Sequence, residues 1–328
     1  MRYARKISQL LLVTAAVFSC VATAQESAGS YPSRLVTVIN PFAPGGAVDR
    51  DTRLYIQKLS ESFGKPFVMD YKSGAGTTIG TGYVAKAAAD GYTLLSVTST
   101  FSVNPAIYTK LNFDTERDIA PVSHMYSRAA VLVVHPSFPA RNWQEYVAYV
   151  KANPGKVNFG TAGGGSIYHI GGAWLHSEIG AKATFVHYKG AGPIMLDIVA
   201  GTIDAFPPTV ATALPQVKAG KLRVIANMSA ARSPLLPDMR TIAEQGLPGF
   251  DFTSWGGILT TGGTPAAIIN KLSNELAKIA KSPDVLQIAA TDGTLMIGST
   301  PEAFQKLIAT EIVRWKKVVQ ENNIRLEE

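Results

Sequence analysis

Short apolar runs alternate with helical stripes of hydrophobic residues along the chain. The first run, residues 35–39, is rich in β-branched side chains and predicts a buried strand. A Pro/Gly turn follows at residues 41–46, and apolar side chains then recur at helical spacing over residues 48–63. This order aims backbone N–H groups at a ligand beyond the strand, although an ordinary β-α connection has the same pattern.

The order of strand, turn and helix recurs along the chain, which indicates the α/β fold class. The apolar run 131–134 ends in a proline-rich break, after which a new β-α series starts. The pattern of the first series resumes after Arg232. The sequence therefore predicts two lobes joined by two crossing segments, with residues 31–128 and 233–328 in the first lobe and residues 129–232 in the second.

Periodicity and turn residues predict the individual elements. Strands are expected at 35–39, 66–72, 92–97, 131–134, 157–160, 184–189, 203–206 and 222–228. Helices are expected at 48–63, 142–152, 242–245, 265–281, 283–291 and 301–322, with others ending near residues 86, 179 and 201. The last helix carries Phe304, Ile308, Ile312, Trp315 and Val319 on one stripe, which indicates a face turned to the core.

The N-terminus has the composition of a targeting segment. Residues 1–24 combine a basic start, a short apolar core and a small-residue cleavage site at 22–24, which predicts a cleavable signal peptide and a periplasmic protein. The single cysteine, Cys20, lies inside this segment, so no disulfide is available to the rest of the chain. A lipoprotein signal with an acylated Cys20 is the alternative interpretation.

The charge distribution argues against a nucleic-acid partner. The formal net charge of the 328-residue chain is +7, and removal of the three cations Arg2, Arg5 and Lys6 with the signal leaves +4. The remaining cations are dispersed, without a Lys/Arg block or a basic-aromatic patch. A mild positive excess is compatible with a small anionic ligand.

Motifs of catalysis and cofactor binding are missing from the sequence. It has no H-E-x-x-H, no G-x-S-x-G and no phosphate-binding loop, and its five histidines are scattered. The glycines at 74–80 resemble a dinucleotide loop only weakly, because no acidic residue ends the next strand. Ser166 and His169 could form a dyad on one helical turn, but Ser166 is also a natural N-cap. We therefore expect no enzyme activity, no cofactor and no metal.

Seven segments together resemble the Bug family, also called TctC-like, the extracytoplasmic solute receptors of tripartite tricarboxylate transporters. These segments are 41–49, 74–76, 89–94, 153–156, 163–169, 188–190 and 237–246, and the resemblance extends over residues 31–324. It implies a two-lobed type II periplasmic binding protein with a cleft between its lobes. Its ligands would be carboxylates: dicarboxylates, tricarboxylates, acidic amino acids or aromatic acids. Membrane subunits of such a transporter are the implied partners, and a monomer is expected.

The resemblance also implies where the ligand binds. Loops matching residues 42–46 and 161–166 pinch one carboxylate, while those matching 98–100 and 207–209 shape the rest of the pocket. Asp49 is expected to brace a loop, with a ligand contact as the alternative, and His187 stands where the family frequently has proline. The full predicted set comprises Phe42, Ala43, Gly45, Gly46, Asp49, Thr98, Ser99, Thr100, Thr161, Ala162, Gly163, Gly165, Ser166, His169, Tyr188, Pro207 and Thr209.

Two other functional classes share these features. A receptor that reports ligand occupancy to a membrane sensor would carry every one of the motifs above. A periplasmic hydrolase would require Ser166, His169 or Asp49 to react with a substrate.

Overall fold

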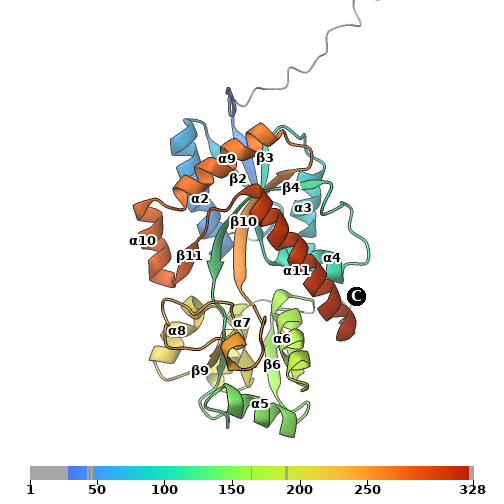
Figure 1. Cartoon of the computed structure of the whole chain (residues 1–328), viewed down its shortest axis with the longest axis vertical. Helices are drawn as coiled ribbons and strands as arrows, with labels where there is room; N and C mark the ends of the chain where they lie inside the picture. Colours follow the sequence, from blue (N-terminus) through green and yellow to red (C-terminus); the bar gives the residue numbers. More distant parts are fainter. Residues whose placement is uncertain (1–28, 43, 45–46, 164, 189–190, 325–328) are drawn as a thin grey trace, which may run out of the picture. The chain divides into compact units, whose positions relative to one another are not determined.

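Two β-sheets organise the chain, as the computed structural model in Figure 1 shows. The structure describes residues 29–42, 44, 47–163, 165–188 and 191–324. Both sheets belong to one compact unit, residues 32–328. The predicted signal peptide, including Cys20, lies outside the described residues.

The first sheet has six strands in the order β11-β4-β10-β3-β1-β2. Strands β1, β2 and β3 are parallel, with Val38 paired to both Met69 and Leu94, whereas β10 runs antiparallel between β3 and β4. Parallel strands place their carboxyl ends at one edge of a sheet. The strands are β1 Val36–Asn40, β2 Phe67–Tyr71, β3 Thr93–Thr98, β4 Ile119–Arg128, β10 Ser254–Thr261 and β11 Thr294–Met296.

The second sheet has five strands in the order β7-β6-β8-β5-β9. Strand β6 is parallel to β7 and β8, and β5 is antiparallel to β8 and β9. Here too, the carboxyl ends of three parallel strands share one edge. The strands are β5 Val131–Val134, β6 Asn158–Thr161, β7 Thr184–His187, β8 Ala205–Phe206 and β9 Arg223–Asn227.

Helices follow most of the parallel strands, as the sequence pattern predicts. Those that pack with the first sheet are α2 Ala47–Phe63, α3 Thr78–Ala85, α4 Thr100–Ile107, α9 Ala266–Ile279, α10 Pro283–Asp292 and α11 Pro301–Glu321. The others are α5 Trp143–Ala152, α6 Ile167–Glu178, α7 Ala191–Ala200 and α8 Val210–Lys218. Two short 3₁₀ turns, η1 Ala75–Thr77 and η2 Ala243–Gln245, complete the described elements.

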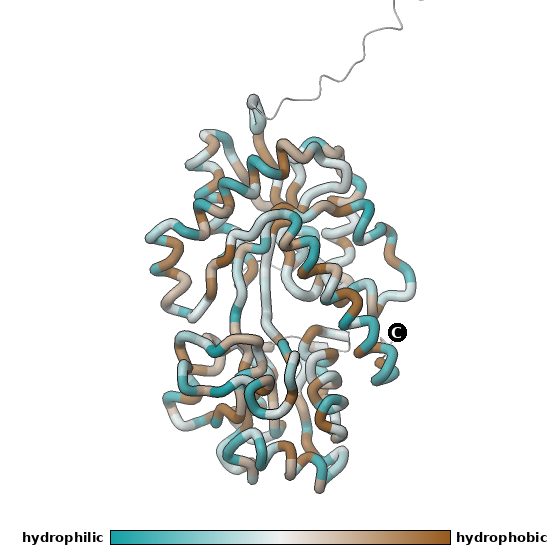
Figure 2. Tube along the Cα trace, viewed as in Figure 1, coloured by the Kyte–Doolittle hydropathy of each residue, from teal (hydrophilic) through white to brown (hydrophobic). Residues whose placement is uncertain are grey.

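Each sheet has its own hydrophobic core. Ile39, Leu95 and Leu259 of the first sheet pack with Phe304 and Ile308 of α11. This confirms the core-facing stripe that the sequence predicts for the last helix, and Figure 2 shows hydrophobic and hydrophilic residues alternating along it. The second sheet has buried side chains on both faces, because helices cover each of them.

The chain rejoins the first sheet only at Ser254. Before that point, Thr241 still pairs with Asn227 of β9, and Phe250 and Phe252 lie in the core beside the second sheet. The two-lobe boundaries at 128/129 and 232/233 remain a prediction. The mixed α/β class with two sheets is confirmed. Within the described residues, no helix is long and apolar enough to cross a membrane.

Candidate functional site

The carboxyl end of β1 is held in place by a buried asparagine. Asn40 is fully buried, and its side-chain oxygen accepts a hydrogen bond from the backbone N–H of Phe42 at 3.0 Å. Its backbone oxygen accepts another from Lys72, directly after β2. These bonds fix the start of the loop that leads to α2. Of the predicted site residues in this loop, Phe42 is half-buried, whereas Ala43, Gly45 and Gly46 lie outside the described residues.

Asp49, in the first turn of α2, is engaged within the protein. Its side chain is nearly buried, and its carboxylate accepts hydrogen bonds from the Tyr71 hydroxyl at 2.6 Å and from Arg53 Nε at 3.3 Å. The bond to Asp49 raises the pKa of Tyr71, because it stabilises the protonated phenol. Asp49 therefore ties α2 to β2, as expected for a residue that braces the loop.

The turn after β3 is more deeply buried than a solvent-facing loop. Thr98 ends the strand, Ser99 is only 2% exposed, and Thr100 begins α4. The backbone N–H of Ser99 donates to the Trp255 oxygen at 3.1 Å, which links this turn to β10. Thr98 and Thr100 are half-exposed as residues, so they are the accessible polar residues of this turn.

A glycine-rich turn follows β6 and opens α6. Thr161 is buried, Ala162 is half-buried, and Gly163 has a φ of +116°, which only glycine adopts readily. Ser166 is the N-cap: its side chain accepts a hydrogen bond from the N–H of His169 at 3.3 Å, as the sequence predicts. Ser166 thus serves as a capping residue, and no hydrogen bond joins its hydroxyl to the His169 ring within the described residues.

The ring of His169 forms a hydrogen bond with the backbone of the same turn. The N–H of Gly165 donates to His169 Nδ1 at 3.1 Å, so this nitrogen carries no proton. Burial lowers the pKa of His169 to about 4, with a smaller effect from the nearby His187, and the ring is neutral at pH 7. The neutral imidazole therefore supports the turn between β6 and α6.

His187, which the predicted site omits, lies next to this turn. Its Nδ1 forms a hydrogen bond with the buried Thr161 hydroxyl at 2.5 Å, and its ring centre is 4.8 Å from that of His169. The backbone of the next residue, Tyr188, donates to the Thr161 oxygen at 2.8 Å. The Tyr188 hydroxyl donates to Asp197, and burial together with this bond raises the pKa of Tyr188 to about 12.

The end of β8 leads into the N-terminus of α8. Pro207 is buried, and Thr209 is the N-cap, whose hydroxyl accepts from the N–H of Thr212 at 3.4 Å. Thr209 also bridges to Ala130, in the segment that joins the two sheets. The structure thus gathers Thr161, Gly163, Ser166, His169 and Tyr188 at one edge of the second sheet, with Thr209 at the end of a neighbouring strand.

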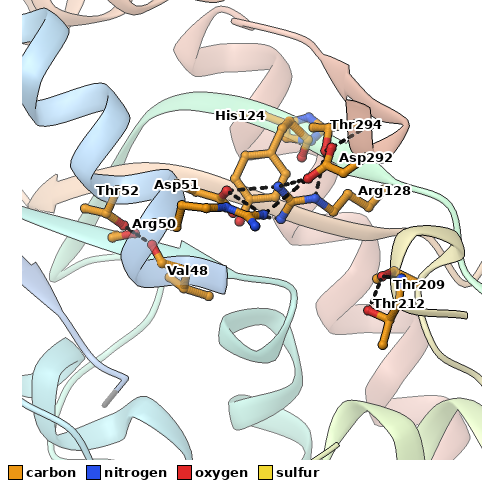
Figure 3. Close-up of polar contacts among 12 residues, drawn as sticks. Val48, Arg50, Asp51, Thr52, His124, Arg128, Thr209, Thr212, Asp292 and Thr294 are labelled. Carbon is orange, nitrogen blue, oxygen red and sulfur yellow. Dashed lines mark hydrogen bonds and ion pairs between the residues drawn. The ribbon is translucent and has the colours of Figure 1, made fainter. Parts of the chain in front are cut away.

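An ion-pair group near the end of β4 is not part of the predicted site (Figure 3). Both terminal nitrogens of Arg128 contact the Asp51 carboxylate, at 2.7 and 2.9 Å, and Nε donates to Thr294. Asp292 lies 3.5 Å from Arg128 and 3.2 Å from Arg50. In the sequence, Arg128 is recognisable only as an arginine shortly before an apolar run. That position does not identify its ion-pair partners.

Hydroxyl groups, backbone N–H groups and the neutral His169 ring are prominent at the two strand-end edges. Such groups bind anions and polar molecules by hydrogen bonding without a fixed cation. Among the described residues, no three His, Cys, Asp or Glu side chains are grouped so as to hold a metal ion.

Comparisons with known proteins place this geometry in a family. The sequence profile described as "Tripartite tricarboxylate transporter family receptor" matches residues 52–324. Protein BugT of Bordetella pertussis is 33% identical over 320 residues, covering 96% of this chain and 98% of BugT. Two solved structures are similar across 100% of their own chains. R. palustris Rpa4515 with adipate has a TM-score of 0.79 at 31% identity over 90% of this chain. MatC from Rhodopseudomonas palustris with bound malate has a TM-score of 0.75 at 30% identity over 88%.

The family profile alone covers well over half of the chain, and the full-length relative exceeds 30% identity. The resemblance found in the sequence is thus confirmed. The chain belongs to the Bug, or TctC, family of tripartite tricarboxylate transporter receptors, whose solved members include the periplasmic binding protein BugD.

Proposed function

We propose that this protein is a periplasmic receptor that captures a small carboxylate, with dicarboxylates as the first candidates, for a transporter of the tripartite tricarboxylate type. The observation that carries the proposal is the likeness, at 30 and 31% identity over most of the chain, to structures that hold malate and adipate. Both of these molecules are dicarboxylates. The protein would act as a monomer, with the membrane subunits of the transporter as its partners.

The proposed site lies at the strand ends of the two sheets. Helices α4, α6 and α8 begin there, at residues Thr100, Ile167 and Val210. A helix N-terminus offers unpaired N–H groups and the positive end of a dipole, about half an elementary charge. One carboxylate would be held by the turns at residues 42–46 and 161–166, and the half-exposed Thr98, Thr100 and Thr209 would shape the remainder.

Capture would couple to hinge motion. The two sheets are joined by the segments around residues 129–130 and 228–253, and receptors of this class close on their ligand by rotation at such crossings. A ligand held by groups from both sheets would favour the closed arrangement, because only that arrangement makes all of its hydrogen bonds.

Calorimetric titration of the chain without residues 1–24 tests the proposal. Malate and adipate are the first probes, and their diamides are matched controls of nearly the same shape without charge. We expect the better acid to bind at least tenfold more tightly than its diamide, which corresponds to about 1.4 kcal/mol.

Salt dependence provides a second measurement. Binding should weaken only modestly between 50 and 200 mM salt, roughly, because hydrogen bonds in a partly buried site are screened less than exposed charges. Equal affinity for acid and diamide would contradict a carboxylate-binding site, and the search would turn to neutral solutes. Turnover of an acid, amide or ester during the titration would contradict a receptor without catalysis.

A further inference from the structure

A cavity lies beside α11, outside the set of residues proposed to hold the carboxylate. Its volume is about 230 Å³, and it opens between α11, strands β4, β10 and β11, and the segments that run between the two sheets. None of the residues of the predicted site lines it. The lining residues that matter for its chemistry are His124, Arg232, Asp251, Leu295, Leu307 and Glu311.

Glu311 is an acidic residue in an apolar position. It lies between Ile308 and Ile312 on the core-facing stripe of α11 and is only 5% exposed. One oxygen, Oε2, accepts from Trp255 Nε1 at 2.8 Å and from the Ser102 hydroxyl at 2.7 Å. Within the described part of the chain, no donor reaches the other oxygen, Oε1. This oxygen is therefore available to accept a hydrogen bond from a molecule in the cavity that Glu311 lines.

A second carboxyl group adds to the negative character of the cavity. Asp251 accepts bonds from the N–H of Ala230 and from the Thr253 hydroxyl, both through Oδ1. Its Oδ2 has no donor among the described residues. Burial and Asp251 both act to raise the pKa of Glu311, with burial the larger effect, which places the two carboxyl groups within electrostatic reach of each other.

The cations around the cavity are engaged elsewhere. Arg232 pairs with Glu244 through Nη2 at 2.8 Å and through Nε at 3.1 Å. Arg314, which acts on Glu311 at longer range, donates to the backbone oxygen of Asp251 and packs over Trp174. Burial lowers the pKa of His124, so that ring is neutral at pH 7. The carboxyl groups therefore lack a cation of their own at close range within the described structure.

Much of the remaining lining is apolar and includes Leu295, Leu307 and Trp255, while hydroxyl groups come from Ser127, Ser229, Ser233 and Thr253. An engineered apolar cavity of about 150 Å³ takes up benzene, so a space of this size accommodates one substituted ring or a short alkyl chain. We propose that this cavity is a second binding site, for a small amine with an apolar body, whose ammonium group donates to Glu311 Oε1. The amine is of opposite charge to the ligand proposed for the strand-end site.

Titration of the solute-free protein at pH 7.5 tests this site, with benzylamine, benzyl alcohol and benzoate as probes of equal size. We expect benzylamine to bind at least tenfold more tightly than benzyl alcohol, and benzoate to bind least. Glu311→Gln keeps the shape of the side chain and an acceptor for Trp255, and it should weaken benzylamine binding at least tenfold while leaving benzyl alcohol unchanged. Glu302→Gln, on an exposed first-turn residue of the same helix, is the matched control and should change neither.

A cavity-filling variant keeps the proposal testable even where Glu311→Gln impairs folding. Leu307→Trp leaves both carboxyl groups in place and should exclude all three probes, while thermal unfolding reports whether the variant is folded. The proposal is overturned by any of three results: no benzylamine binding at millimolar concentration, equal binding to Glu311→Gln, or a preference for benzoate. Because the preferred probe carries no carboxylate, this outcome is independent of whether malate or adipate binds.

Discussion

Arg128 and Asp51 form a two-point ion pair across 77 residues of sequence, with each terminal guanidinium nitrogen on a different carboxylate oxygen. Their side chains are 12% and 10% exposed. Arg128 ends β4, and two residues later the chain bridges to Thr209 beside the second sheet. The pair therefore fixes α2, which follows the proposed ligand loop, to the strand that leads into the crossing segment.

Removal of Arg128 should be strongly destabilising. Arg128→Met leaves the buried carboxylate of Asp51 with the neutral Tyr126 hydroxyl and the more distant Arg50, at 3.7 Å, and breaking one partner of a buried pair typically costs about 3 to 5 kcal/mol. Urea unfolding curves measure the loss. The double variant Arg128→Met with Asp51→Asn should recover part of it, because no unpaired charge remains.

The matched control for this pair is at the surface. Arg34 and Asp90 also form a short contact, at 2.9 Å, but their side chains are 63% and 40% exposed. Arg34→Met should therefore change the unfolding free energy little. If Arg128→Met changed it no more than Arg34→Met does, the Arg128 pair would have no structural role.

Much of the fold could be predicted because its signals are local. The predicted strand 131–134 has the same bounds as β5, and the helix predicted at 142–152 starts one residue later, with Asn142 as its N-cap. Helices α4 and α8 gave no such signal, because each contains a proline, Pro105 and Pro215, and α4 is buried on several sides rather than on one stripe. Strand β4 was also not predicted, since bulges in its pairing with β10 interrupt the alternation.

The candidate site, too, could be predicted only where its signals are local in the sequence. The capping role of Ser166 is readable from three neighbouring residues, and the structure shows the bond. The partners of Arg128, by contrast, are set by how distant elements pack, which spacing in one sequence does not encode. The buried position of Glu311 could have been predicted from the sequence. This acidic residue lies between two isoleucines of a core-facing stripe, where a charged side chain is costly without a partner.

Gly171 of α6 should not tolerate a side chain. A Cβ there would lie 2.0 Å from the Phe252 ring, so Gly171→Ala must displace an aromatic ring that packs in the core beside the second sheet. Overpacking of this kind costs about 1 to 3 kcal/mol, more than the roughly 1 kcal/mol that alanine gains as a helix former. Thermal or urea unfolding measures the net change in the free energy of unfolding, and we expect Gly171→Ala to be destabilising.

Gly192 of α7 provides the matched control, because a Cβ there meets nothing within 4 Å of the described structure. Gly192→Ala should leave the protein equally stable or more stable. Equal effects of the two alanine substitutions would contradict the close packing of α6 against Phe252.

Acid should destabilise the fold through buried histidines. His176 is 2% exposed, donates from Nδ1 to the Gly172 oxygen and forms a hydrogen bond with the Tyr146 hydroxyl, and burial lowers its pKa to about 4. Below about pH 6.5, His176 becomes protonated in the unfolded chain but stays neutral in the folded protein. The contribution of His176 to the free energy of unfolding is therefore fully present above about pH 6.5. It falls by about 3 kcal/mol as the pH approaches 4.

Unfolding free energies between about pH 8 and 4 measure this effect. His176→Gln removes the titrating group and should reduce the slope in the acid part of this range. His135→Gln is the control, because His135 is less buried and its ring forms hydrogen bonds only to Ser137 among the described residues. Identical slopes in the wild type and in His176→Gln would refute the assignment.

The last prediction concerns how His169 contributes to ligand binding. Its ring accepts a bond from Gly165 and, with a pKa of about 4, stays neutral, so its role is to support the turn after β6 rather than to supply a positive charge. Between about pH 8 and 6 the ring and an ordinary ligand carboxylate both keep their charge states. The affinity for the best carboxylate should accordingly be constant over this range in calorimetry. His169→Asn, whose side-chain oxygen can accept in place of Nδ1, should retain more affinity than His169→Phe, which has no acceptor and should lose at least tenfold. An affinity that rises as the pH falls through this range, and that no longer does so in His169→Asn, would instead show that a protonated His169 binds the ligand directly.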